Sequence, residues 1–330
     1  MNKLSDEYNK EVIEFDREQE VSHICKQMRM ALQTDLHRRG VVVAVSGGID
    51  SSVCAALAVK AFGPKKTFLI QLPERDSANI SQSRSGELIS HLGAEHISQD
   101  IAPVLDAIGC YKSRDDAIRT VFSDYTSDWK CKIAIRGGLS GKINHFSLIV
   151  ENPAGETFEQ RLDIKAYLQI IAATSYKQRV RKTIEYFHAD RLNYAVIGTP
   201  NRLEYDQGFF VKNGDGSADM KPIAHLYKTQ VYALARHFDL PENICNAQPS
   251  TDTYSLEQGQ DEFYFALPYE QMDKALWAYN RNANQHDLAE FLGITEEQAG
   301  FILEDIAKKR RTTQYLHRKP VLMKEIDLSV

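Results

Sequence analysis

The Ser-Gly-Gly-Ile-Asp-Ser-Ser turn at residues 46–52 limits the fold more than any other part of the 330-residue sequence. The mostly β-branched run Val41 to Val45 precedes it and predicts a strand buried on both faces of a parallel sheet. Residues 50–62 follow it with an alanine-rich helical composition, and Gly63-Pro64 ends that helix. A strand, a glycine turn and a helix in this order predict the first unit of a doubly wound α/β fold.

The turn also has the chemistry of a phosphate-binding loop. Two adjacent glycines let the backbone turn sharply and expose N–H groups, while the helix start adds its positive dipole end. Asp50 would repel a phosphate unless a divalent cation lay between them, so we expect Mg²⁺ here. An ordinary Gly-Gly turn between strand and helix is the simpler alternative. The predicted pyrophosphate cradle consists of Ser46, Gly47, Gly48, Asp50, Ser51 and Ser52.

Strands and helices alternate further along the chain. The expected elements are strands at 67–72, 95–97 and 194–199, and helices at 81–92, 168–187 and 228–238. This alternation predicts a mostly parallel sheet flanked by helices. Ligands of such sheets bind at the carboxyl ends of the strands, where the turns after Val45 and Ile197 lie.

Two regions depart from the alternation within an expected single domain, residues 1–330. Apolar positions at helical spacing predict one amphipathic helix from Val12 to Arg39, in an N-terminal helical region at 1–39. Strand-like pieces separated by glycine turns predict a small antiparallel β insertion at 130–163. We favour a surface decoration over a functional lid for this insertion, because insertions at loops cost little stability.

Composition excludes several classes of protein. The formal net charge of -5 argues against broad, nonspecific nucleic-acid binding. No run approaches the roughly 18 apolar residues of a membrane span, and the polar N-terminus is unlike a signal peptide. We therefore expect a cytoplasmic protein without membrane contact. The five cysteines form no Cys-x-x-Cys pair, which argues against a disulfide framework or a zinc site.

The phosphate loop resembles that of the ATP pyrophosphatase superfamily, whose fold is the Rossmann-like, adenine nucleotide alpha hydrolase-like type. Members of this superfamily split ATP into AMP and pyrophosphate while they adenylate a substrate. They include NAD synthetases, GMP synthetases, asparagine synthetases and tRNA-modifying enzymes. The loop implies ATP as co-substrate but names no carboxylate.

A second segment resembles the signature of NAD synthetases. It reads Gly-Thr-Pro-Asn-Arg-Leu-Glu at 198–204 and Gly-Phe-Phe-Val-Lys-Asn-Gly-Asp-Gly-Ser-Ala-Asp at 208–219, followed by Pro222 and Lys228. The resemblance extends over most of the chain outside the N-terminal helical region and the β insertion. It implies ammonia-dependent amidation of deamido-NAD⁺ through an adenylated carboxylate, with release of AMP and pyrophosphate.

The resemblance also implies roles for single residues in the ATP half of the reaction. Thr199 and Lys228 are implied to contact ATP, and Glu204 joins Asp50 as a ligand of Mg²⁺. Asp50 and Lys228 are the implied catalytic residues, because Lys228 would neutralise charge that builds during adenylation. A solvated lysine at a helix end is the alternative for Lys228. Ser250 matches the hydroxyl residue that contacts ATP, and Thr251 replaces a usual alanine, so either hydroxyl could serve.

Cationic residues dominate the implied site for deamido-NAD⁺, as suits a dinucleotide with a pyrophosphate. The implied residues are Arg179, Lys212, Asp219, His317 and Arg318. A solvated basic tail is the alternative for the last two. The chain departs from the family mostly on this side: Thr174-Ser175 stands for Gly-Asn, and the C-terminal basic motif is shortened to 317–320.

The resemblance further implies a homodimer with the acceptor site at the subunit interface. No amidohydrolase domain is expected beside this domain in 330 residues, so ammonia comes directly from solution or from a separate glutaminase. Three alternatives stay open: a related ligase that amidates a different carboxylate, a tRNA-modifying enzyme and a noncatalytic nucleotide-binding regulator. The lack of a cysteine pair and of basic excess argues against the second, and Asp50, Glu204 and Lys228 together argue against the third.

Overall fold

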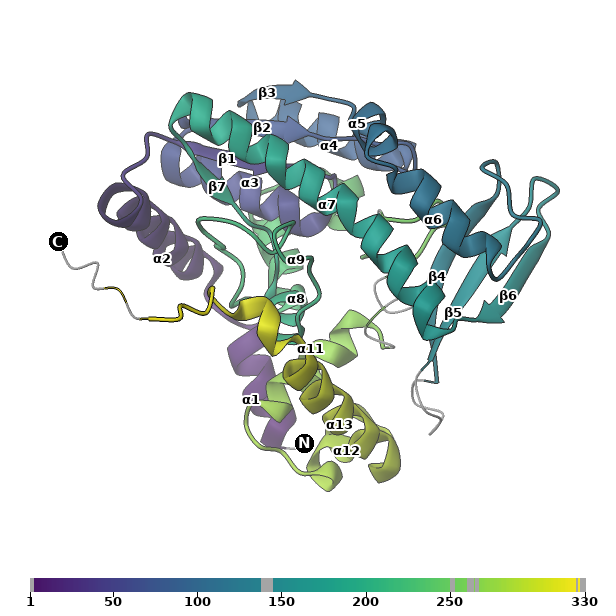
Figure 1. The fold of residues 1–330 in the computed structure, drawn as a ribbon. Coiled ribbons are helices and arrows are strands. Elements are labelled where there is room, and N and C mark those ends of the chain that lie inside the picture. The colour runs from purple at the N-terminus through teal and green to yellow at the C-terminus, as the bar shows by residue number, and fades with distance from the viewer. Residues whose placement is uncertain are drawn as a thin grey trace.

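A computed structural model describes residues 3–137, 145–249, 253–259, 264, 267–324 and 326. Its central sheet has four parallel strands in the order β3-β2-β1-β7 (Figure 1). These strands are β1 (Val41–Ala44), β2 (Thr67–Gln71), β3 (Glu95–Ser98) and β7 (Ala195–Ile197). β1 is central because its apolar run tolerates burial on both faces, whereas the more polar β3 lies at an exposed edge. The predicted doubly wound α/β fold is confirmed.

Helices cover both faces of this sheet. Val41 and Val43 point into an apolar cluster with α2 (Arg17–Met30), α3 (Ile49–Phe62) and α9 (Lys228–His237). Val42 points to the opposite face, toward α5, α6 and the long helix α7. Figure 1 shows α7 running across the sheet and on to the β insertion. The other helices of the described chain are α1 (Lys3–Tyr8), α4 (Asn79–Leu92), α5 (Ala102–Ala107), α6 (Cys110–Arg119), α7 (Ile164–Leu192), α8 (Arg202–Gln207), α10 (Glu242–Cys245), α11 (Tyr269–Tyr279), α12 (Gln285–Leu292) and α13 (Glu296–Thr313). Shorter helical turns are η1 (Asn9–Ile13), η2 (Ala31–Asp35), η3 (Pro64–Lys66) and η6 (Gln314–His317).

The N-terminal region is not the single helix that the apolar spacing predicts. The first helical piece ends at Ile13, and α2 begins at Arg17. Asp16 caps α2 by accepting a hydrogen bond of 2.9 Å from the backbone N–H of Gln19, which fixes a helix start at this point. The two pieces pack into different apolar clusters, since Tyr8 contacts Trp277 while α2 packs on α3.

The β insertion is the antiparallel sheet that the sequence predicts. Its strands β4 (Lys130–Arg136), β5 (His145–Glu151) and β6 (Thr157–Arg161) pair in the order β4-β5-β6. The insertion shares an apolar cluster with α6, α7 and Tyr254. Residues 255–257 run along its β4 edge, where the N–H of Leu256 donates to the carbonyl of Cys131 at 3.1 Å.

A C-terminal group of helices has no counterpart in the sequence predictions. Helices α11, α12 and α13 pack with α1 and α8 around Trp277. Gly208 ends α8 with φ +71°, and a Cβ there would lie 2.3 Å from Cβ of Thr313 on α13. Glycine is therefore needed at 208 both for the left-handed turn and for the close approach of α13. In the described part of the chain, we find no helix with the length and apolar character of a membrane span.

Candidate functional site

The phosphate loop lies between β1 and α3, as the sequence predicts. Gly47 has φ +81°, and a Cβ at this position would lie 2.4 Å from the carbonyl oxygen of Ser81 on α4. The loop thus needs glycine both for its backbone angle and for its contact with α4. The N–H of Ser46 donates to Oγ of Ser51 at 3.3 Å, and that hydroxyl donates to the carbonyl of Gly48 at 3.0 Å. These bonds hold the turn in a defined shape.

The hydroxyl residues predicted to contact ATP differ in where they lie. Ser46, Ser51 and Thr199 line two cavities beside the loop. Ser52 is fully buried, lines neither cavity, and donates to the carbonyl of Gly48 at 2.9 Å, which strengthens the first turn of α3. The alternatives Ser250 and Thr251 lie outside the described residues.

Lys228 and Asp50 form an ion pair at the start of α3. The ammonium of Lys228 donates to Oδ2 of Asp50, and Asn201 donates to Oδ1 at 3.0 Å. Lys228 is only 1 % exposed, so the alternative of a solvated lysine at a helix end is wrong. Burial alone would lower the pKa of Lys228, but the carboxylates of Asp50 and Glu204 raise it above its ordinary value. Lys228 is therefore a permanent positive charge beside the phosphate loop.

Asp273 on α11 fixes the backbone that carries Lys228. Its carboxylate accepts hydrogen bonds from the N–H of Lys228 at 3.1 Å and from the N–H and hydroxyl of Thr229, both at 2.7 Å. Asp273 thereby satisfies two of the free N–H groups at the start of α9. Burial raises the pKa of Asp273 to about 7. The sequence around Lys228 does not predict this cap, because the capping residue Asp273 is 45 positions away.

Asn201 and Glu204 form a capping box at the start of α8. The N–H of Asn201 donates to Oε2 of Glu204 at 3.2 Å, while Oδ1 of Asn201 accepts from the N–H groups of Leu203 and Glu204. The spacing Asn-x-x-Glu carries this information, and the sequence analysis overlooked it. Since Asn201 also donates to Asp50, it ties together the two carboxylates predicted to bind a metal.

The donor set suits Mg²⁺. Asp50 and Glu204 both line the larger of the two cavities beside the phosphate loop. Within the described residues, no cluster of three or more His, Cys, Asp or Glu side chains is placed to hold a metal. Mg²⁺ is typically held by one or two carboxylates and takes its other ligands from phosphate and water, so two carboxylates beside a phosphate loop fit it. A structural zinc site would need about four protein ligands.

Two cavities meet at the phosphate loop. The smaller, of about 260 Å³, lies among the end of β2, α4 and α7, and includes Gln71, Ser81 and Arg181. The larger, of about 370 Å³, is walled by aromatic side chains that include Phe146 from β5 and Tyr167 from α7. Residues common to both are Ser46, Ser51, Gln178, Thr199, Asp215 and Thr253. Two cavities on either side of one phosphate loop can bind the two substrates of a nucleotide-dependent reaction.

Phe146 brings the β insertion to the wall of the larger cavity. Its ring stacks on Tyr167, with ring centres 4.3 Å apart and planes 16° apart. The insertion thus contributes a side chain to the candidate site. Its interpretation as decoration or lid stays a prediction.

The structure brings together most of the residues predicted to bind the acceptor. Arg179 donates to the carbonyl of Lys212 at 3.3 Å, and the ammonium of Lys212 donates to the carbonyl of Tyr315 at 2.9 Å. His317 and Arg318 follow Tyr315 directly. His317 and Arg318 are exposed, and the ring of His317 packs edge-on against Tyr205 and Phe210. These residues lie outside the two cavities.

Asp219 lies apart from this cluster. Its carboxylate accepts a bond of 2.7 Å from the N–H of Val196 and one of 3.2 Å from the hydroxyl of Tyr186. In the described part of the chain, no hydrogen bond or ion pair joins Asp219 to the other four predicted acceptor residues. Asp219 thus bonds to the backbone of β7 and to Tyr186 on α7.

Lys221 lies beside the aromatic rings that contact His317, and it was not among the residues predicted from the sequence. Its ammonium lies 5.0 Å from the ring centre of Tyr205 and donates to the carbonyl of Gly216 at 2.7 Å. Burial lowers the pKa of Lys221. Burial and the nearby Lys221 together hold the pKa of His317 below its ordinary value. The position of Lys221 inside the 198–228 segment was the only sequence signal.

The sequence is similar to known proteins over nearly its whole length. The NAD synthase family model matches residues 20–121 and 138–320. The NH(3)-dependent NAD(+) synthetase of Mesorhizobium japonicum is 50% identical over 316 residues, which cover 96% of this chain and 99% of that protein. The enzyme of the same name from Rhizobium meliloti is 48% identical and covers 97% of this chain and 96% of its own.

Solved structures share the fold at lower identity. NMN synthetase from Francisella tularensis has a TM-score of 0.65 at 22% identity, covering 93% of this chain and 98% of its own. The NH3-dependent NAD synthetase from Campylobacter jejuni has a TM-score of 0.61 at 19% identity, covering 94% of this chain and 100% of its own. At such identities the likeness concerns the fold.

Proposed function

The chain belongs to the NAD synthase family, and we propose that it makes NAD⁺ by amidating deamido-NAD⁺ with ammonia and ATP. The observation that carries the proposal is the Asp50–Lys228 ion pair at the phosphate loop, with Glu204 on the wall of the same cavity. A buried cation and two carboxylates beside a phosphate loop suit the binding of a triphosphate with Mg²⁺.

The proposed reaction has two steps. A carboxylate oxygen of deamido-NAD⁺ attacks the α-phosphorus of ATP, the bond to the β-phosphate oxygen breaks, and pyrophosphate leaves. The nitrogen lone pair of ammonia then attacks the activated carbonyl carbon, AMP leaves, and the nitrogen gives up a proton to form the amide. The protein contributes by positioning and by charge neutralisation.

Residues of the chain have distinct tasks in this scheme. Backbone N–H groups of the phosphate loop and the hydroxyls of Ser46 and Ser51 bind phosphate oxygens. Lys228 neutralises negative charge on the departing pyrophosphate. Asp50 and Glu204 would hold Mg²⁺, which when bound supplies positive charge and orients the phosphates. Phe146 and Tyr167 exclude water from the larger cavity, where the adenylate forms.

A homodimer is part of the proposal. Ile164, Leu168 and Phe187 on the outer side of α7 are 77%, 57% and 62% exposed, which is unusual for large apolar residues on a helix. Arg179, predicted to bind the acceptor, is also exposed on α7. A second copy docked on α7 would cover the apolar residues and lie beside Arg179. Sedimentation of Leu168→Glu and Phe187→Glu variants tests this: both should be monomers, and an unchanged dimer would exclude this face.

The decisive test of the activity is a panel of carboxylates. Purified protein is given Mg-ATP and ammonium with deamido-NAD⁺, nicotinate mononucleotide or a general carboxylic acid, and AMP and pyrophosphate are quantified. We expect turnover with deamido-NAD⁺ in at least tenfold preference. No AMP with deamido-NAD⁺, but AMP with another acid, would identify the related ligase instead.

The remaining parts of the proposal concern the setting of the enzyme. We propose that it acts in the cytoplasm, without nucleic-acid or membrane partners. Its ammonia comes directly from solution or from a separate glutaminase, in line with relatives named NH(3)-dependent. Ammonium should support turnover of the purified protein and glutamine should not. Turnover with glutamine alone would contradict this source.

A further inference from the structure

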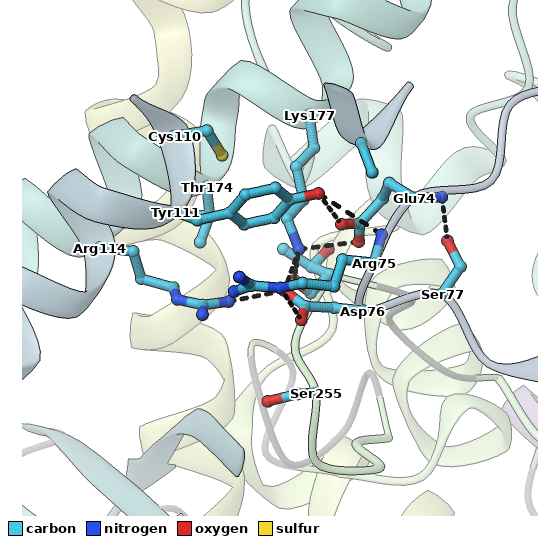
Figure 2. A network of polar contacts seen from close by, with 12 residues as sticks. Glu74, Arg75, Asp76, Ser77, Cys110, Tyr111, Arg114, Thr174, Lys177 and Ser255 are labelled. Atoms are coloured by element: carbon cyan, nitrogen blue, oxygen red, sulfur yellow. Dashed lines mark hydrogen bonds and ion pairs between the residues drawn. The ribbon is translucent and has the colours of Figure 1, made fainter. Parts of the chain in front are cut away.

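A buried ionic network lies beside the candidate site and is centred on Lys177 (Figure 2). Lys177 is fully buried, and its ammonium contacts Oε1 of Glu74 at 2.8 Å, Oδ2 of Asp76 at 2.7 Å and the carbonyl of Thr253 at 2.7 Å. Three donors thus meet three acceptors. The acceptors come from the loop after β2 and from a segment 177 or more positions further along the chain.

The carboxylates of the network have further partners behind Lys177. Glu74 accepts a hydrogen bond of 2.8 Å from the hydroxyl of Tyr111, and Asp76 pairs with Arg114 at 2.6 Å. Arg114 also pairs with Asp115 at 2.7 Å. Apolar side chains of equal size would often be as stable in such a place as buried ions. The directional ion pairs and hydrogen bonds of the network therefore hold the loop after β2 and Thr253 in more defined positions than apolar packing would.

The network connects to the cavities through Thr253 and through the chain neighbours of Glu74 and Asp76. Pro73 and Ser77 flank the two carboxylates in the chain and line the smaller cavity, while Thr253 lines both cavities. Gln178, next to Lys177, donates to the hydroxyl of Thr253 at 3.4 Å and also lines both cavities. Thr253 is therefore held through its carbonyl by one residue and through its hydroxyl by the next.

Gln178 also offers a group to a ligand. Its amide oxygen is buried and has no hydrogen-bond partner among the described residues. A buried polar atom without a partner costs free energy, so a polar ligand in either cavity would satisfy it. On α7, Lys177 thus holds the segments that form the cavity walls, while its neighbour Gln178 lines the cavities.

We propose that Lys177 is a positioning residue for nucleotide binding. By holding the loop after β2 and the Thr253 carbonyl at once, it sets the distance between walls that belong to distant parts of the chain. The proposal rests on the proposed function only for the identity of the nucleotide, ATP. Lys177 lines neither cavity, so its effect must pass through Glu74, Asp76 and Thr253.

The test separates positioning from stability with a charge-compensated pair. Lys177→Met leaves two buried carboxylates short of a cation, and we expect the melting temperature to fall by several degrees and the affinity for ATP to fall at least tenfold. Lys177→Met with Glu74→Gln removes one cation and one anion together. This double variant should regain most of the melting temperature, yet still bind ATP at least fivefold more weakly than wild type.

The matched control removes a pair from the far end of the same network. Arg114→Met with Asp115→Asn also deletes one buried cation and one anion but no contact to Thr253, and it should bind ATP within twofold of wild type. Titration calorimetry with a nonhydrolysable ATP analogue measures affinity without any acceptor. The result therefore does not depend on whether deamido-NAD⁺ is the acceptor.

Two outcomes would overturn the proposal. One is recovery of both melting temperature and ATP affinity in the double variant, which would make Lys177 a stability residue only. The other is equal loss of ATP affinity in the control pair. Steady-state kinetics gives an independent check, because a positioning role predicts a raised KM for ATP with the KM of the acceptor within twofold.

Discussion

Asn201 donates a hydrogen bond of 3.0 Å from Nδ2 to Oδ1 of Asp50, across 151 positions of sequence. The same residue caps α8, and its backbone N–H bonds to Glu204. One asparagine thus orients both carboxylates that we assign to Mg²⁺. Mutation of a group that orients metal ligands typically lowers metal affinity or activity roughly 10- to 100-fold.

We first predict that Asn201→Ala weakens the response to Mg²⁺. Activity at limiting Mg²⁺ should fall about 10- to 100-fold and recover partly at high Mg²⁺. Asn284→Ala is the matched control, because Asn284 caps α12 by accepting from Asp287 at 2.9 Å, away from the site. Each variant should lose about 1 kcal/mol of unfolding free energy as a lost cap. Equal activity of the two variants would contradict the assignment.

Asp50→Asn should abolish Mg²⁺-dependent turnover. The amide keeps the size of the side chain but loses the charge that faces Lys228 and the metal, so kcat/KM should fall by about 10³ or more. Pyrophosphate release measures the loss, and circular dichroism reports the fold. Asp16→Asn provides the control, because asparagine caps α2 as well as aspartate does and activity should not change. Wild-type kinetics for Asp50→Asn would mean that Asp50 is misassigned.

Lys212→Ala should affect the acceptor more than ATP. Its ammonium lies with Arg179 and the 315–318 segment, outside both cavities at the phosphate loop. Loss of one charge-assisted hydrogen bond is worth about 1.5–3 kcal/mol, so the KM for deamido-NAD⁺ should rise roughly tenfold or more. The KM for ATP should rise less than threefold. Lys308→Ala on the exposed side of α13 should change neither value.

Phe146→Ala tests whether the β insertion takes part in function. Phe146 stacks on Tyr167 in the wall of the larger cavity, and an aromatic pair contributes about 0.5–1.5 kcal/mol beyond its buried area. We expect the acceptor KM to rise several-fold. Phe158→Ala, on β6 and stacked on Trp129 away from the cavity, is the matched control. Unchanged kinetics for both variants would support the interpretation of the insertion as decoration.

The network around Lys177 predicts a defined pH dependence. Burial alone would raise the pKa of Asp76, but Lys177 and Arg114 hold it below its ordinary value. Because the pKa is lower in the folded protein, the stabilisation is present above about pH 4 and is lost as pH falls through the folded pKa. Urea unfolding should show Asp76→Asn less stable than wild type by about 3 kcal/mol at pH 6. That difference should shrink by pH 3.

The control for this experiment is Asp6→Asn, which removes an exposed carboxylate of α1. Its unfolding free energy should stay within about 0.5 kcal/mol of wild type at both pH values, as for most surface substitutions. A difference between wild type and Asp76→Asn that does not change from pH 6 to pH 3 would show that Asp76 does not gain stability from its charge.

Local patterns in the sequence predict the parts of the fold that depend on local interactions. The run from Val41 is buried on both faces, the glycine turn follows it, and the strands of the insertion alternate with turns, so each is visible within about ten residues. The N-terminal break at Asp16 was also visible, since Asp16 and Gln19 have the spacing of a helix cap. Helical spacing on either side of the break concealed it.

Contacts between distant residues account for what sequence could not predict. Asp273 caps α9 from 45 positions away, and Lys177 meets Glu74 across 103 positions. Neither residue belongs to a pattern that marks it as charged, buried and paired. The family resemblance predicted Lys228 and Glu204 as site residues, but it did not predict Asp273 and Asn201, which hold them in place. Those groups become visible only when the helices are packed.

The edges of the insertion sheet have a consequence for solubility. β6 is exposed along its whole length and carries Glu159, paired with Arg136, so charge discourages another strand from joining it. β4 also carries charge, with Lys130, Lys132 and Arg136, and residues 255–257 cover its free edge. The segment beside the nucleotide site therefore also seals a sheet edge. A substitution that detached residues 255–257 from β4 would expose unpaired backbone groups at the sheet edge. The protein would then aggregate before a loss of activity could be measured.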